Sequence, residues 1–309
     1  CNNIMIEIDN YLNRLQKDNF VIFLFHGVVH NSDYEVRNYT KKHILSSEFE
    51  ELIKRLIQKG NPISMEEIIF YKQNNNKYPP FSYAITFDDG FENNYTIAAP
   101  ILDSFQQKAI FYISTDLVEN NTITWTDRAE FCLENVRAGS VKFPWENETI
   151  KFSDAKSKIS LMKYLRYYLK SNLDVNANEV VDSLYEKFKI DEEKCGHSEL
   201  DKKLNWNQVR ALSNNTNFIV AGHSHQHLSL TSLSEKELEH QVDTSIRLLL
   251  DKGGVESHHY CYPEGQEIDY SEDVINLLKS KGIKCCPTAI DGVNNEETDL
   301  FNLKRIMVD

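Results

Sequence analysis

The amino-acid sequence predicts an α/β fold, specifically a distorted or incomplete (β/α)7-type barrel with a helical insertion. Short apolar runs of strand length alternate with amphipathic helical segments, a pattern typical of parallel strands joined by helical crossovers. The alternation breaks over residues 115–204, which are charged and mostly helical in pattern. Polar clusters stand directly after several apolar runs, where barrel enzymes carry their chemistry.

The first half of the chain supplies three strands and the helices between them. Residues 21–26 (VIFLFH) form an apolar run that predicts a buried strand. Ser64 and Glu67 have the spacing of a helix capping box. The other elements predicted here are helices at residues 46–59, 64–71 and 95–105 and strands at residues 83–87 and 109–114.

The second half begins with the insertion and then resumes the alternation. Within the insertion we expect helices at residues 125–138, 153–170 and 179–190. Beyond it we expect helices at 206–212, 234–250 and 271–281 and strands at 218–221, 260–262, 283–286 and 303–308. Residues 1–309 are therefore interpreted as a single catalytic domain. The insertion is expected on a loop at one end of the barrel, where it can shape substrate access.

Composition excludes several classes of partner. The formal charge of −13 argues against nucleic acid, whose phosphates require a basic surface. No apolar run approaches the roughly 20 residues that span a bilayer. The six cysteines show no regular framework and are interpreted as reduced thiols of a cytoplasmic protein. The alternatives are a lipoprotein, with Cys1 as the lipid-acceptor cysteine after signal cleavage, and a periplasmic protein.

Two adjacent carboxylates follow the strand predicted at residues 83–87. Asp88 and Asp89 stand before Gly90 in the segment TFDDG. A turn with a helix cap is the ordinary explanation of such a segment, since Asp and Gly favour both. The functional interpretation divides the labour, with one carboxylate binding a cation and the other acting as a base beside a bound water.

Three histidines follow the strand predicted at residues 218–221. On a helical turn, His223 and His227 share one face, whereas in an extended chain His225 joins them. A lone histidine is usually structural, but three within five residues favour a metal site. Two histidines and one aspartate leave coordination positions open for water, as in catalytic zinc sites.

TFDDG followed downstream by H-S-x-x-H resembles the polysaccharide deacetylases of the NodB homology type, carbohydrate esterase family 4. The resemblance covers most of the chain outside the insertion. It implies that Asp88 is the catalytic base and that Asp89, His223 and His227 bind a divalent metal, most simply Zn²⁺. His225 falls on a variable position of the motif and receives no role.

The third family motif, a strand ending in R-x-P-[FY]-G, is altered in this chain. It reads Cys261-Tyr262-Pro263-Glu264-Gly265, so the arginine and the aromatic residue are both replaced. In the family, a backbone N–H of this turn helps to bind the oxyanion, and a backbone donor survives the replacement of the aromatic residue. Arg305 is either the substitute for the missing arginine or a surface charge at a strand end.

The general acid of the family usually lies near the C-terminus, where this chain has no suitable histidine. The segment Ile22-Phe23-Leu24-Phe25-His26 has the same I-x-L-x-H pattern near the N-terminus. It resembles the circularly permuted branch of the family, typified by poly-N-acetylglucosamine deacetylases. This resemblance implies that His26 protonates the leaving amine, whereas the structural alternative is a histidine bonded to a carbonyl at a strand end.

These motifs predict a metal-dependent hydrolase that removes N-acetyl or other N-acyl groups from a carbohydrate, within surface-glycan metabolism. A non-catalytic glycan-binding module on the same scaffold is one alternative. A Mg²⁺-dependent phosphatase is a weaker one, because its D-x-D-G signature is absent and Mg²⁺ sites do not use a histidine pair. The sugar and the acyl group are not defined by the sequence.

Overall fold

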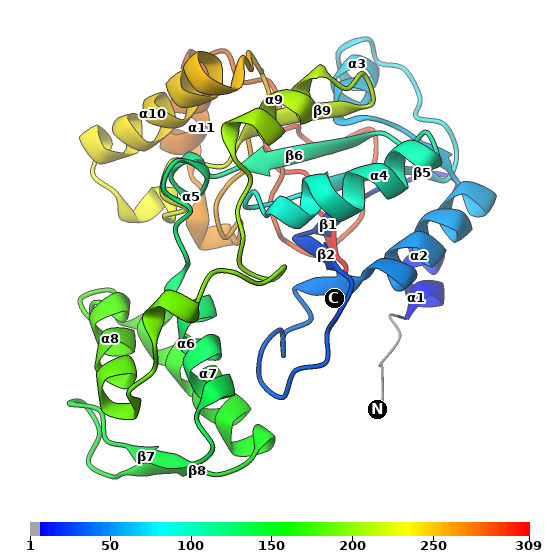
Figure 1. The fold of residues 1–309 in the computed structure, drawn as a ribbon. Coiled ribbons are helices and arrows are strands. Elements are labelled where there is room, and N and C mark those ends of the chain that lie inside the picture. Colours follow the sequence, from blue (N-terminus) through cyan, green and yellow to red (C-terminus); the bar gives the residue numbers. More distant parts are fainter. Residues whose placement is uncertain (1–6) are drawn as a thin grey trace. The chain divides into compact units, whose positions relative to one another are not determined.

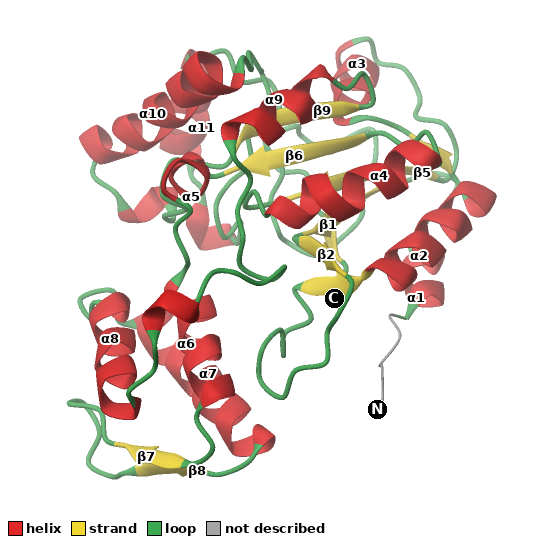
Figure 2. Cartoon of the chain, in the orientation of Figure 1, coloured by secondary structure: helices red, strands yellow, loops and turns green. Residues whose placement is uncertain are grey.

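The computed structural model describes residues 7–309, so the interpretation of Cys1 as a lipid acceptor lies outside the described residues. The chain forms two compact units and combines helices with a parallel sheet (Figures 1 and 2). The barrel unit extends to His30 and continues over Lys42–Thr122 and Lys203–Asp309. The helical unit consists of Asn31–Lys41 and Ile123–Lys202.

The barrel unit is built on a parallel sheet with the strand order β10-β1-β5-β6-β9. Short β4 runs beside the start of β5. These strands are β1 (Phe20–Phe25), β4 (Asn61–Pro62), β5 (Ser82–Phe87), β6 (Ala109–Ile113), β9 (Phe218–Gly222) and β10 (Ile306–Met307). The α/β prediction is confirmed, and the first and last strands of the described chain are neighbours.

Irregular segments complete the barrel between β9 and β10. The N–H of Cys261 donates to Gly222 at 3.0 Å, and that of Tyr260 donates to Cys285 at 3.1 Å. The N–H of Cys286 in turn donates to Leu300 at 2.9 Å. The strands predicted at 260–262 and 283–286 are therefore wrong as regular strands, and the one predicted at 303–308 shortens to β10. Prolines at 263 and 287 lack an N–H and interrupt the regular ladder, although Thr288 resumes the pairing by donating its N–H to Leu303 at 2.9 Å.

Helices surround this sheet, and most begin where the sequence predicts. Helix α2 (Ser46–Lys59) has the predicted bounds, while α10 (Glu235–Gly253) and α3 (Met65–Gln73) both start at serine capping boxes. The remaining elements of the unit are α1 (Ile8–Asn13), η1 (Asn94–Ala98), α4 (Ala99–Ser104), α5 (Thr115–Asn120), α9 (Trp206–Asn214), η3 (Leu230–Ser232), η4 (Glu267–Asp269), α11 (Glu272–Ser280), β2 (Gly27–Val29) and β3 (His43–Leu45). Strands β2 and β3 pair in parallel.

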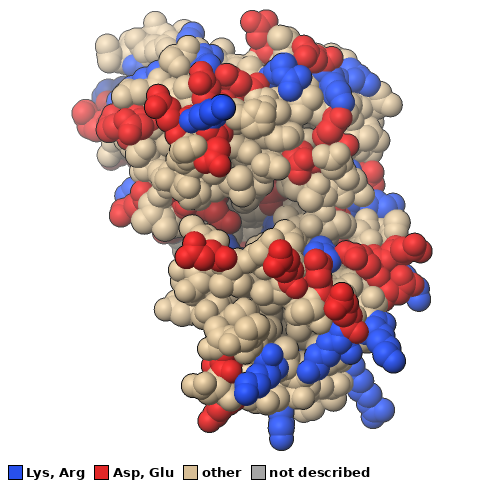
Figure 3. All heavy atoms as spheres, turned by 90° about the vertical axis from the view of Figure 1, so that its left-hand side faces the viewer, with Lys and Arg blue, Asp and Glu red and all other residues tan. Residues whose placement is uncertain are grey.

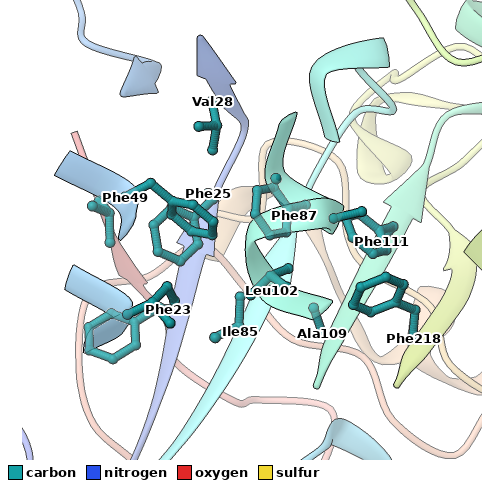
Figure 4. Packing of buried hydrophobic residues seen from close by; sticks show 14 of the residues in the cluster. Phe23, Phe25, Val28, Phe49, Ile85, Phe87, Leu102, Ala109, Phe111 and Phe218 are labelled. Atoms are coloured by element: carbon teal, nitrogen blue, oxygen red, sulfur yellow. The ribbon is translucent and has the colours of Figure 1, made fainter. Parts of the chain in front are cut away.

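The strands bury side chains on both faces, because helices cover one face and the barrel interior the other. On the helix-covered face, phenylalanine rings form a row across four strands (Figure 4). Phe25 and Phe87 have ring centroids 5.2 Å apart, Phe87 and Phe111 5.1 Å, and Phe111 and Phe218 5.3 Å. This row fixes the register of the strands whose ends carry the polar clusters.

The interior of the barrel has a second apolar cluster, to which the opposite faces of the same strands contribute. Ile22, Ala84 and Tyr112 belong to it, together with Met65 and Ile68 of α3. Helix α3 therefore packs across the end of the barrel where the strands begin. Lys108, which directly precedes β6, forms an ion pair with Glu67 at 2.9 Å and agrees with this placement.

The helical unit has its own core. It contains α6 (Trp125–Asn135), α7 (Ala155–Ser171), α8 (Ala177–Phe188), η2 (Glu192–Lys194) and the antiparallel pair β7 (Gly139–Val141) and β8 (Ile150–Phe152). The carboxylate of Glu134 accepts hydrogen bonds from the N–H groups of Glu35, Val36 and Arg37. This is how residues 31–41 join residues 123–202, whereas α5 belongs to the barrel unit. The helical unit thus differs in its bounds from the insertion expected at 115–204.

The surface of the described residues carries charges of both signs, and their cysteines form no disulfide bonds. On the face in Figure 3, acidic and basic side chains are interspersed. No helix within residues 7–309 has the length and apolar character required to cross a bilayer. The cysteines of this range are free thiols: Cys132, Cys195, Cys261, Cys285 and Cys286.

Candidate active site

The two adjacent carboxylates lie at the end of β5, in a turn that the barrel holds in place. Asp88 donates its N–H to the carbonyl of Phe25, the last residue of β1. Asp89 has a φ of 81°, which is uncommon for a residue with a side chain. Both side chains are buried. The turn therefore directs two carboxylates of one strand end toward different partners.

The histidines follow β9, the strand two places away from β5. His223 Nδ1 donates to the carbonyl of Cys261 at 3.0 Å, because that oxygen can only accept, and in the neutral ring this leaves Nε2 available as a ligand. Ser224 and His227 have φ values of 60° and 56°, so the segment is a turn. It is neither a helical turn nor an extended strand. His225 instead contacts Thr115, with Nδ1 at 2.9 Å from Oγ1.

Asp89 and the two histidines converge on one point. Asp89 Oδ1 lies 3.2 Å from His227 Nε2 and 3.6 Å from His223 Nε2. This buried oxygen accepts no hydrogen bond of good geometry from residues 7–309. Burial would raise the pKa of Asp89, but Lys42 and His227 outweigh it and hold this pKa well below its usual value. An ionised carboxylate with an unsatisfied oxygen between two imidazoles fits a divalent cation.

Asp88 forms a two-pronged ion pair with Arg305. Arg305 Nη1 donates to Asp88 Oδ1 at 2.8 Å and Nη2 to Oδ2 at 2.7 Å. Arg305 also donates to the carbonyl of Thr288 at 2.6 Å and to Cys261 Sγ at 3.1 Å. It is 1% exposed, so it is not a surface charge. Burial raises the pKa of Asp88, but Arg305 lowers it by more. The pKa therefore falls below its usual value, and the carboxylate stays ionised.

His26 lies between β1 and β2, at the same end of the sheet as the carboxylates. Its carbonyl accepts a hydrogen bond from Asn94 Nδ2 at 2.9 Å, and its buried Nδ1 has no partner within residues 7–309. Burial lowers the pKa of His26 to about 4, against the opposing effects of Asp89 and Asp88. Gly27 next to it has no room for a side chain, because a Cβ would lie 1.9 Å from His43 Nδ1.

The third motif forms a tight turn beside these groups. Glu264 has a φ of 62°, and Gly265 donates its N–H to the carbonyl of Pro263 at 2.7 Å. The carbonyl of Gly265 accepts from Ala289 at 2.8 Å, which ties the turn to the next segment of the barrel. The backbone of this motif is thus ordered without the family's arginine and aromatic residue.

Sequence reasoning did not find two groups that contact the predicted residues. Lys42 Nζ lies 3.3 Å from Asp89 Oδ2 and 4.7 Å from the ring centre of Phe91. Lys42 stands in a loop without a recognisable pattern, so no signal pointed to it. Cys261 Sγ is 3.9 Å from Asp88 Oδ1. Its place in the motif was visible in the sequence, but its contact with Arg305 was not.

Comparison with known protein families identifies the class to which this fold and site belong. The model of the polysaccharide deacetylase family matches residues 75–286. This chain therefore belongs to the polysaccharide deacetylase family, and it is a carbohydrate deacetylase, as predicted. The matched range contains Asp88, Asp89, His223 and His227, while His26 and Arg305 lie outside it.

Solved structures of deacetylases share the fold. The chain resembles the Streptococcus pyogenes deacetylase PplD in complex with acetate, with a TM-score of 0.59 and 15% identity, covering 94% of this chain and 93% of that one. IcaB from Ammonifex degensii has a TM-score of 0.57 and 15% identity, covering 96% of this chain and 94% of that one. The BpsB deacetylase domain from Bordetella bronchiseptica has a TM-score of 0.52 and 18% identity, covering 94% of this chain and 96% of that one. A search of curated proteins found no match.

Proposed function

We propose that this deacetylase removes N-acetyl groups from an amino sugar of a surface glycan, with Zn²⁺ bound by Asp89, His223 and His227. The observation that carries the proposal is the convergence of Asp89 Oδ1 and the two Nε2 atoms, at 3.2 and 3.6 Å. The acetyl group is favoured because a solved deacetylase of similar fold contains acetate.

The donor set supports zinc over the harder cations. Two imidazole nitrogens and one carboxylate oxygen are typical of catalytic Zn²⁺, whereas Mg²⁺ and Ca²⁺ prefer oxygen ligands alone. When bound, the ion supplies Lewis acidity that activates a water molecule and polarises the acyl carbonyl. With its Nδ1–H directed at the Cys261 carbonyl, His223 keeps Nε2 unprotonated for this purpose.

Asp88 is suited to accept the proton of the attacking water. Arg305 holds both of its oxygens and keeps the carboxylate ionised at neutral pH. Because the guanidinium is rigid and buried, it also fixes the direction of the carboxylate. The backbone N–H of Glu264, in the turn at Pro263–Gly265, then stabilises the negative charge that develops on the acyl oxygen.

His26 is suited to protonate the departing nitrogen. With its pKa lowered to about 4, the imidazolium is a strong acid that holds a proton only briefly. It receives the proton that Asp88 took from water and passes it to the amide nitrogen. The C–N bond then breaks, and the products are acetate and a free amino sugar.

The other two hypotheses require different behaviour. A Mg²⁺-dependent phosphatase needs a free aspartate nucleophile, whereas Asp88 is held by Arg305 through both oxygens. A non-catalytic glycan-binding module would bind N-acetylated sugars without releasing acetate. Acetate release and phosphate release, measured on the same zinc-loaded protein, separate all three.

Asp88→Asn tests the proposal most directly. The amide cannot take the proton of water, so we expect acetate release to fall by about 10²–10⁴-fold. Zinc bound to the protein, measured by elemental analysis after gel filtration, should be unchanged. Asp18→Asn, at an exposed turn, is the matched control and should retain full activity. Full activity of Asp88→Asn, or no acetate release by the unaltered chain from any N-acetyl sugar, would contradict the proposal.

A further inference from the structure

A second group of one carboxylate and two imidazoles lies at the end of the barrel where the strands begin. His258 Nε2 and His259 Nε2 each lie 2.7 Å from the same oxygen, Glu66 Oε2. We call Glu66, His258 and His259 the Glu66 site, and Asp89, His223 and His227 the Asp89 site. Within each site, the three potential ligand atoms lie within 4.8 Å of one another.

Regular secondary structure positions the Glu66 site. Glu66 stands in the first turn of α3, between Ser64 and Glu67, the two residues of the capping box. His259 pairs with Cys285, and the carbonyl of His258 accepts from Lys284 at 2.8 Å. The backbone on both sides is therefore held by hydrogen bonds that do not involve the site itself.

The directions of the two rings are unusual for consecutive residues. In an extended chain, neighbouring side chains point to opposite sides, but the chain bends at His258, which allows both rings to lie on one side. Here the ring centroids of His258 and His259 are 4.9 Å apart with an interplanar angle of 32°, and both Nε2 atoms meet one oxygen. A single ion pair requires only one of these rings, so their convergence is the geometry of a chelate.

The outer ring nitrogen of His259 also suits a cation. His259 Nδ1 has no hydrogen-bond partner within residues 7–309, so it can carry the ring hydrogen when Nε2 binds a metal.

We infer that Glu66, His258 and His259 form a second zinc site, separate from the Asp89 site and structural in its effect. Two imidazoles and one carboxylate select Zn²⁺ over Mg²⁺ or Ca²⁺. The ion replaces the hydrogens that both Nε2 atoms direct at Glu66 and joins the start of α3 to the segment before Tyr260. Water completes the coordination on the exposed side, since the Glu66 side chain is 51% exposed.

Such a link stabilises the barrel because α3 covers its interior. Met65 and Ile68, on either side of Glu66 in the helix, pack into the interior cluster. Zinc bound to the folded chain at 100 times its dissociation constant should raise the melting temperature by about 5 °C. No catalytic residue proposed above belongs to the Glu66 site, so deacetylase activity does not depend on it.

Zinc stoichiometry tests the inference. The metal-free chain is mixed with zinc chloride, passed through a gel-filtration column and measured by elemental analysis. We expect two equivalents in the unaltered chain, one in His258→Gln, one in His227→Gln and none in the double variant. His258 has a 38% exposed side chain, so its replacement should not prevent folding. His240→Gln, another exposed histidine, is the matched control and should hold two.

Two further readouts separate this inference from the proposed catalytic site. His258→Gln should release acetate at the rate of the unaltered chain and should lose only the part of the zinc-dependent rise in melting temperature that the Glu66 site contributes, and that part should persist in His227→Gln. A zinc equivalent that persists in His227→Gln and disappears on adding His258→Gln supports the Glu66 site even if no acetate is ever released. Two equivalents in His258→Gln, or none in His227→Gln, would overturn it.

Discussion

The Asp89 site and the Glu66 site offer the same three donors at opposite ends of one barrel, and they differ in what surrounds them. Asp89, Ser224 and His227 all have φ values between 56° and 81°, so the first site rests on backbone in the left-handed region. The second rests on a capped helix and on a segment that bends at His258 and pairs at His259. Strained backbone of this kind is concentrated at functional sites.

The two sites also differ in the ionisable groups that surround them. The Asp89 site adjoins a buried carboxylate held by Arg305, and His26 lies close enough for both aspartates to affect its pKa. No comparable base or acid accompanies the Glu66 site among the described residues, apart from the lysine-bound Glu67. On the roles proposed above, the donors determine which ion binds, whereas the adjacent proton-transfer groups determine whether that ion takes part in a reaction.

Removing Arg305 should have the largest effect. In Arg305→Met, Asp88 loses its orientation and remains buried without a counter-charge. We expect acetate release to fall by about 10²–10⁴-fold and the free energy of unfolding to fall by about 3–5 kcal/mol. Denaturant unfolding and acetate release measure the two effects.

The double variant Asp88→Asn with Arg305→Met separates positioning from stability. It leaves no unpaired carboxylate, so it should recover much of the lost stability and none of the activity. Recovery of activity, or Arg305→Met with an unchanged rate, would contradict the role proposed for Arg305.

His26→Gln should show an effect that depends on the leaving group. The rate on an N-acetyl sugar should fall by about 10²-fold, because the amine leaves only when protonated. The rate on an acetate ester of an acidic phenol should change little, since a phenolate leaves without a proton. Equal losses on the two substrates would assign His26 to a structural role.

Much of the fold was readable because burial leaves a clear pattern. The strands β1, β5, β6 and β9 are continuous apolar runs, and α2 and α10 have ordinary start signals. The segments around Pro263 and Pro287 also have the pattern of strands, but proline interrupts their ladders, and the pairing that remains is irregular. Periodicity cannot show where a missing N–H breaks a ladder.

The residues of the candidate site also fall into two groups, those that the sequence indicated and those that only the fold revealed. The motifs that contain Asp88, Asp89, His223 and His227 are local, and the structure brings these residues together; their catalytic roles stay predictions. Arg305 stands 217 positions from its partner Asp88, so only the closed barrel reveals their contact. Lys42 lies in an irregular loop, and nothing in the sequence linked it to Asp89.

Lys42 gives a smaller, more selective difference between the sites. Its ammonium lies 3.3 Å from Asp89 Oδ2 and repels a cation bound there. Lys42→Met should therefore tighten zinc binding at the Asp89 site by about tenfold, a change of about 1.4 kcal/mol, measured by competition with a chelating dye in the His258→Gln background. The same substitution in the His227→Gln background should leave zinc affinity unchanged. Weaker binding at the Asp89 site would mean that Lys42 supports the ion.

The smallest expected effect is the acid sensitivity of the Glu66 site without metal. The pKa of Glu66 is lowered from 4.5 to about 2, so its contribution to stability is present above pH 4.5 and is lost as the pH falls toward 2. The half-exposed pair should be worth about 1–2 °C in melting temperature relative to Glu66→Gln. A difference that grows on acidification would contradict this assignment.

The pairing of the first strand with the last has a consequence for biosynthesis. The ribosome completes Asp88, Asp89 and both histidines of the Asp89 site long before it reaches Arg305 and β10. A nascent chain can hence contain the proposed metal ligands while its barrel is still open and the proposed base Asp88 is not yet oriented. If Arg305 has the role proposed for it, activity requires the last strand, so fragments released early by stalled translation should not hydrolyse glycans.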